Sequence, residues 1–145
     1  MPTRLFSLFA GLVYLLIGVC GFIPALKSSG PYPAGYGPTA VSTGYGMLFG
    51  WMPVNAVHGV VYVLVGVLGI VAAIAYPIAR AYVRGLFFFA TLLTFMGLLP
   101  WGVSRVWGLM PLYGWNVFVN AAVAITAVYF AFVYPHVREA GPEPV

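Results

Sequence analysis

The feature that most constrains the fold of this chain is an apolar segment that occurs twice. Residues 11–23 read Gly-Leu-Val-Tyr-Leu-Leu-Ile-Gly-Val-Cys-Gly-Phe-Ile, and residues 59–71 read Gly-Val-Val-Tyr-Val-Leu-Val-Gly-Val-Leu-Gly-Ile-Val. Seven of the thirteen positions are identical, and the other six exchange one apolar residue for another. On an α-helix, with ~100° per residue, three glycines and the tyrosine of each segment fall within an arc of ~80°. We call these two stripes the glycine seams; their glycines are Gly11, Gly18 and Gly21 in the first and Gly59, Gly66 and Gly69 in the second.

The glycine seams predict two membrane helices that pack closely. Lipid tails are as apolar as leucine, so membrane helices associate through small residues that let their backbones approach. The composition agrees, because 63% of the residues are hydrophobic and only 6% are charged, whereas a soluble domain has about 25% charged residues. We therefore predict an integral membrane protein with a single domain over residues 1–145.

Four apolar stretches predict the spans of this domain. About 20 apolar residues cross the hydrocarbon core of a bilayer. The expected helices cover about 5–24, 54–76, 81–100 and 114–134, with outer loops 25–53 and 101–113 and a cytoplasmic tail 135–145. The first is expected to be an uncleaved span, because no clean cleavage site follows it. Residues 39–51 are expected to lie on the membrane or to form a short helix. The predicted fold class is all-α, a polytopic membrane protein with four transmembrane helices in a bundle.

The two halves of the sequence resemble each other. Gly21-Phe22-Ile23-Pro24 ends the first helix and Gly97-Leu98-Leu99-Pro100 ends the third. Leu48-Phe49-Gly50-Trp51 precedes the second helix and Leu112-Tyr113-Gly114-Trp115 precedes the fourth. This pattern predicts two duplicated helical hairpins in parallel orientation, with chance similarity in a glycine- and tryptophan-rich sequence as the alternative.

The distribution of basic residues predicts the orientation. With four helices, the two termini and the central turn share one side of the membrane. That side holds Arg4, Arg80, Arg84 and Arg138, and the other holds Lys27 and Arg105. Because cytoplasmic loops carry an excess of positive residues, we expect both termini in the cytoplasm.

A small set of polar residues within the apolar stretches is the candidate site. Asn55 lies on the second glycine seam, with His58 about 20° beyond its edge. Asn116 and Asn120 lie one turn apart at the same, outer end of the fourth helix. Together these four residues could form a polar cluster that contacts a ligand. The alternative is that the asparagines cap helix starts or hydrogen-bond between helices.

His58 is the one candidate cofactor-binding residue. An imidazole can ligate haem iron or the magnesium of a chlorophyll-type pigment. The other histidine, His136, is expected a membrane thickness away, so one chain cannot supply both ligands of a bis-histidine haem. We predict no cofactor and no metal; haem, a chlorophyll-type pigment or a quinone remain alternatives at His58.

Motifs of other function classes are missing from the sequence. There are no paired carboxylates, no metal-binding set and no glycine-rich phosphate loop before a lysine. We therefore predict that the protein is not an enzyme. Six basic residues spread along the chain make no basic patch, so nucleic acid is not an expected partner.

Several of these residues also carry a family resemblance. The first helix ends Gly21-Phe22-Ile23-Pro24, and Asn55-Ala56-Val57-His58-Gly59 opens a glycine-rich second helix. In this the chain resembles the family of bacterial four-span membrane proteins called domain of unknown function 4383. The resemblance implies a small protein of the bacterial inner membrane, cytoplasmic or photosynthetic, with no established activity. Members of that family tend to carry a second histidine at the start of the fourth helix, where this chain has Asn116 to Asn120.

The favoured function is that of a non-catalytic accessory subunit. Apolar helix faces, two glycine seams and an aromatic outer loop offer much docking surface and little chemistry. The expected partners are the lipid bilayer and other integral membrane proteins of a larger complex. One alternative is a pigment- or quinone-contacting subunit of a photosynthetic or respiratory complex; the other is a small carrier or channel for an uncharged solute.

Overall fold

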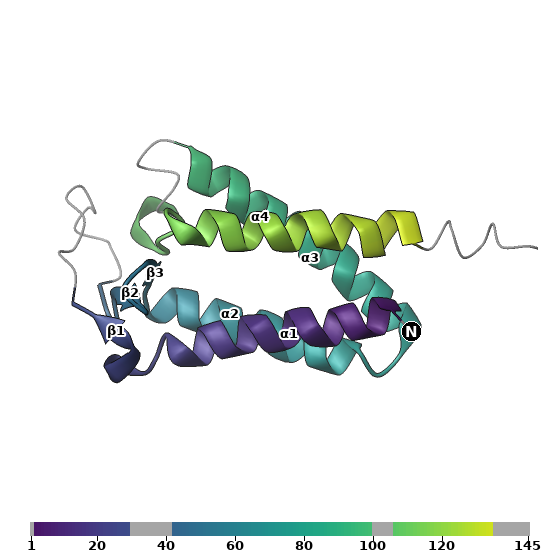
Figure 1. Ribbon diagram of the computed structural model, residues 1–145, viewed down its shortest axis with the longest axis horizontal. Coiled ribbons are helices and arrows are strands. Elements are labelled where there is room, and N and C mark those ends of the chain that lie inside the picture. Colours follow the sequence, from purple (N-terminus) through teal and green to yellow (C-terminus); the bar gives the residue numbers. More distant parts are fainter. Residues whose placement is uncertain (1, 30–41, 100–105, 135–145) are drawn as a thin grey trace, which may run out of the picture.

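The protein is described by a computed structural model that covers residues 2–29, 42–99 and 106–134. Its helices are α1 (Pro2–Cys20), α2 (Ala56–Ala72), α3 (Tyr76–Leu98) and α4 (Trp115–Val128), and α4 continues as a short π-helix, η3 (Tyr129–Val133). Two 3₁₀ turns, η1 (Pro24–Leu26) and η2 (Val106–Gly108), lie in the connections. Figure 1 shows the helices side by side, with the strands at one end of the bundle and the turn from α2 to α3 at the other.

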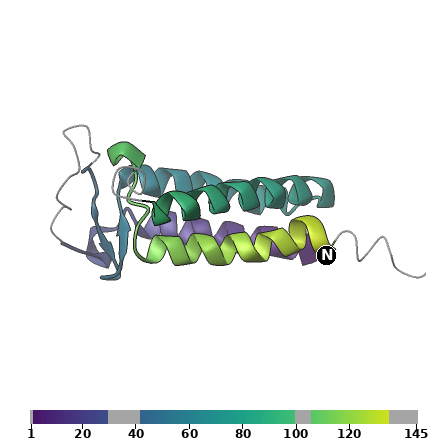
Figure 2. The same ribbon diagram turned by 90° about the horizontal axis from the view of Figure 1, so that it is seen from above.

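The helices form two closely packed pairs. The most extensive packing is between α1 and α2 and between α3 and α4. Figures 1 and 2 together show the start of α1, the turn from α2 to α3 and the end of α4 at the same end of the bundle. The arrangement therefore places the three basic residues Arg4, Arg80 and Arg84 toward one end and Lys27 at the other.

A small sheet covers the end of the bundle where α1 ends and α2 begins. Its strands β1 (Lys27–Ser28), β2 (Gly46–Leu48) and β3 (Met52–Val54) pair antiparallel in that order. Lys27 pairs with Leu48, and Leu48 pairs with Met52. Of the two alternatives for residues 39–51, the short helix was wrong for 46–48, which form a strand, and the all-α class omits this sheet. The cause is a tight hairpin, because Phe49 (φ 52°) and Gly50 (φ 82°) reverse the chain and let β2 and β3 share their hydrogen bonds.

The break between the second and third helices differs from the prediction. We expected the second helix to reach residue 76 and the third to start at 81; instead α2 ends at Ala72 and α3 starts at Tyr76. Pro77 therefore does not end a helix but occupies the first turn of α3. A proline fits there because the first N–H groups of a helix have no intrahelical partner.

Three helices are long and apolar enough to cross a membrane by length and composition: Pro2–Cys20, Tyr76–Leu98 and Trp115–Val133. The fourth, Ala56–Ala72, is apolar but shorter, with 17 residues. Three of the four predicted spans therefore have the length and composition of a membrane-crossing helix, and α2 falls short of that length.

Candidate functional site

The glycine seams of α1 and α2 face each other. A Cβ atom added at Gly11 would lie 2.7 Å from the backbone nitrogen of Ile70, and one at Gly18 would lie 2.7 Å from that of Val63. Gly66 meets the backbone of Leu15 in the same way. A real Cβ atom cannot occupy these positions, so the absence of side chains is what lets the two backbones touch.

The other seam glycines have different neighbours. A Cβ at Gly69 would meet both Gly11 and the hydroxyl of Tyr82, and one at Gly59 would meet the ring of Phe22. Gly21 differs, because its closest neighbours are carbonyls of its own preceding turn rather than atoms of α2. The seam of α1 thus makes its interhelical contact through Gly11 and Gly18.

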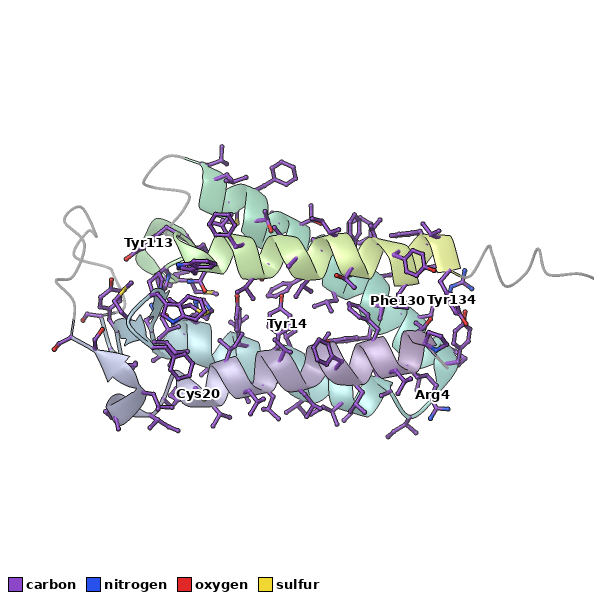
Figure 3. All side chains as sticks on the ribbon, in the orientation of Figure 1. Arg4, Tyr14, Cys20, Tyr113, Phe130 and Tyr134 are labelled. Atoms are coloured by element: carbon purple, nitrogen blue, oxygen red, sulfur yellow. The ribbon has the colours of Figure 1, made fainter. Side chains whose placement is uncertain are left out.

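Close packing of the seams brings their two tyrosines together in the centre of the bundle. The rings of Tyr14 and Tyr62 meet edge to face with centroids 4.7 Å apart, and both side chains are completely buried. The Tyr14 hydroxyl donates to Oδ1 of Asn120 at 2.9 Å, and Nδ2 of Asn120 donates to the Tyr62 hydroxyl at 2.8 Å. Figure 3 shows Tyr14 pointing from α1 toward α4. One asparagine of α4 therefore joins α1 and α2; we call this group the Tyr–Asn–Tyr clamp.

The other two asparagines of the predicted cluster hold backbone segments at the sheet end. Asn55 is the N-cap of α2: its Oδ1 accepts from the backbone N–H of His58 at 2.9 Å, and its Nδ2 donates to the carbonyl of Leu109 at 2.7 Å. Asn116 donates to the carbonyls of Pro53 and Pro111, each at 2.7 Å. These bonds tie β3 and the segment 109–113 to the starts of α2 and α4.

His58 lies beneath this segment and is completely buried. Its ring is 4.1 Å from that of Tyr62, centroid to centroid. The carbonyl of Pro111 lies close to the imidazole, but neither ring nitrogen makes a hydrogen bond of normal geometry within the described residues. Any ligand that reaches His58 has to displace the covering segment, because no edge of the ring is open.

The structure brings the four predicted residues into one region and adds others that the sequence reasoning left out of the site. Asn120 contacts Asn116 by donating to its carbonyl at 2.8 Å. Tyr14 and Tyr62 were recognised only as members of the seams, although a tyrosine at the same position of both repeats was an available signal. Ser7 was missed as well; its hydroxyl donates to the carbonyl of Gly69 at 2.8 Å.

The chemistry of this region is that of neutral donors and acceptors. Within the described residues, no group of three or more His, Cys, Asp or Glu side chains could hold a metal ion. The only acids of the chain, Glu139 and Glu143, and the second histidine, His136, lie outside the described residues. What the arrangement does in the structure is hold helices and loops in register.

Three helices with the length and composition of membrane spans, seams of glycine and neutral polar groups bonded across helices are the features of a small helical membrane protein. The sequence profile of the family described as "Domain of unknown function (DUF4383)" matches residues 4–133, and the chain belongs to this family. The family resemblance noted in the sequence is thereby confirmed. Searches of curated proteins and of solved structures each found no match.

Proposed function

We propose that this chain is a non-catalytic accessory subunit of a larger bacterial membrane protein complex. The observation that carries the proposal is a hollow of about 320 Å³ on the outer face between α3 and α4. It is lined by Phe87, Thr91, Thr94, Phe95, Ala121, Ala124, Ile125 and Val128. Small residues and hydroxyls on an outer helix face are the features through which membrane helices associate.

The two hydroxyls of this hollow differ in their hydrogen bonding. The Thr94 hydroxyl donates to the carbonyl of Ala90 within its own helix at 2.7 Å. The Thr91 hydroxyl oxygen is shielded from solvent and has no hydrogen-bond partner in the described part of the chain. A neighbouring helix seated in the hollow would cover its apolar wall.

We include α2 as a fourth span in this proposal, with both termini in the cytoplasm of a bacterial cell. At 1.5 Å per residue its 17 residues extend over ~25 Å, which is at the lower limit for a span. Its glycine seam runs along that of α1 from Gly59 beside Gly18 to Gly69 beside Gly11, so the two helices reach similar depths.

The proposed duplication of a helical hairpin is supported by the two helix pairs. Gly50 and Gly114, which occupy corresponding places before α2 and α4, both have positive φ angles. The tryptophans that follow them, Trp51 and Trp115, meet edge to face at 5.1 Å. Two related hairpins that place related residues side by side would produce this arrangement.

Affinity purification from native membranes in mild detergent tests the docking proposal. We expect the wild-type chain to retain a stoichiometric membrane-protein partner, and Ala121→Trp, which fills the hollow, to lose it. Leu16→Trp is the control, because Leu16 is 62% exposed on α1 and does not line the hollow. Absence of a stoichiometric partner from the wild type, or its retention by Ala121→Trp, would contradict the proposal.

The buried imidazole of His58, whose ring nitrogens make no hydrogen bond of normal geometry within the described residues, favours a second candidate function, contact with a pigment or quinone. A buried polar group without a hydrogen bond is uncommon in proteins and calls for an explanation. An absorbance spectrum of the protein purified from its native membrane tests this. A visible band that is present in the wild type and lost in His58→Gln would establish a pigment ligand, whereas a spectrum without such a band would remove that role.

A further inference from the structure

Three arginines lie toward the end of the bundle opposite the sheet, and the described residues supply no carboxylate to pair with them. Arg4 lies in the first turn of α1, and Arg80 and Arg84 lie in the first turns of α3. Figure 3 shows Arg4 at this end, where Tyr134 at the close of α4 also lies. Residues 2–134 contain no Asp or Glu at all. Guanidinium groups at a membrane surface therefore need anions from outside this part of the chain.

Arg4 is held in place at the rim of a hollow. Its Nε donates to the carbonyl of Ala73, the C-cap residue of α2, at 2.7 Å. Its two terminal amino groups make no hydrogen bond within the described residues. The hollow has a volume of about 180 Å³ and is lined by Arg4, Leu5, Leu8 and Ala73.

We propose that this hollow binds the phosphate group of an anionic phospholipid. Two terminal amino groups of a guanidinium match two phosphate oxygens in a bidentate contact. Leu5, which is 60% exposed, and Leu8 continue the hollow along α1 as an apolar wall that fits the start of an acyl chain. Basic pockets between helices at the cytoplasmic surface of membranes are suited to anionic head groups.

Other features of this end favour the same ligand. The N-termini of α1 and α3 both lie here, and the helix macrodipole places partial positive charge at an N-terminus. A free phosphate would gain the electrostatic contact but not the leucine wall, so a phospholipid is the fitting occupant.

The test separates lipid binding by Arg4 from its role in capping α2. In Arg4→Gln, the amide nitrogen takes the place of Nε along the side chain and can still donate to Ala73, but the charge is gone. Lys27→Gln is the matched control, because it removes one charge at the opposite end, where Lys27 Nζ donates to Gly44. The measurement is native mass spectrometry of each variant released from micelles that contain equal amounts of phosphatidylglycerol and phosphatidylcholine.

We expect the wild type and Lys27→Gln to retain phosphatidylglycerol in preference to phosphatidylcholine, and Arg4→Gln to retain about fivefold less of it. Melting in detergent provides a second readout: added phosphatidylglycerol should stabilise the wild type but not Arg4→Gln. Equal retention by Arg4→Gln and the wild type, or no preference in the wild type, would overturn the proposal. Displacement of the lipid by millimolar inorganic phosphate would assign the hollow to free phosphate and overturn the lipid assignment.

Discussion

Asn120 is the residue on which the interior of the bundle most depends. It is 1% exposed, and its side chain bonds Tyr14 of α1, Tyr62 of α2 and the backbone of its own helix. A polar side chain in a membrane is stable only when its groups are paired. Because its amide oxygen and its amide nitrogen are both hydrogen-bonded, Asn120 is suited to joining helices rather than to binding a solute.

Replacement of Asn120 by alanine should lower the free energy of unfolding by about 2 kcal/mol. The change removes two hydrogen bonds between helices, each worth ~0.6 kcal/mol, and one within α4, and it leaves two buried tyrosine hydroxyls to find other partners. Unfolding in mixed micelles of mild detergent and SDS measures the effect. Thr126→Ala is the control, since the Thr126 hydroxyl bonds only the carbonyl of Ala122 in its own helix. Equal stability of the two variants would show that the clamp does not hold the helices.

At the scale of secondary-structure elements, α1 and α2 pack with their backbones in direct contact at the seam glycines. Gly18→Ala should destabilise the protein by about 1–3 kcal/mol, because its Cβ would meet the backbone of Val63 and force the helices apart. Gly85→Ala is the matched substitution, because the added Cβ meets no atom within 4 Å other than the nearby backbone of its own helix, and alanine favours a helix by up to ~1 kcal/mol. The measurement is the melting temperature of each variant in the same detergent. If the melting temperature of Gly18→Ala equals or exceeds that of Gly85→Ala, close packing of the seams does not stabilise the fold.

The elements differ in how far their sequences predict them. The seams could be predicted because the spacing of Gly11 and Gly18 is a local pattern that a helix turns into a face. The sheet could not, because β1 pairs with β2 across about 20 residues and each strand has only two or three residues. In strands this short, an alternation of apolar and polar residues cannot be distinguished from the surrounding apolar sequence.

The polar site shows the same limit. Asn55 could be recognised as a helix cap from its position before an apolar run. The bond between Tyr14 and Asn120 joins residues 106 positions apart, so it follows from the packing of α1 against α4 and not from any local spacing. The neutral character of the cluster, by contrast, was already evident from the near absence of charge in the helices.

At the scale of the whole molecule, the positions of the basic residues predict the orientation in the membrane. In a variant with Cys20 replaced by alanine, cysteines at Ser29 and Thr43 should react with an impermeant maleimide from outside the cell, since both positions are exposed at the sheet end. A cysteine at Gly141, in the predicted cytoplasmic tail, should react only after the membrane is opened. The reverse pattern would place Arg4, Arg80 and Arg84 outside and refute the predicted orientation.

The interior polar groups hold the bundle together, and we propose that the surface between α3 and α4 receives a partner. Crosslinking in native membranes tests this most directly, with a photoreactive amino acid placed at Ala121 in the hollow and, in a second variant, at the exposed Leu16 of α1. We predict a discrete protein–protein adduct from position 121 and none from position 16. No adduct at position 121, or equal adducts at both positions, would contradict docking between α3 and α4.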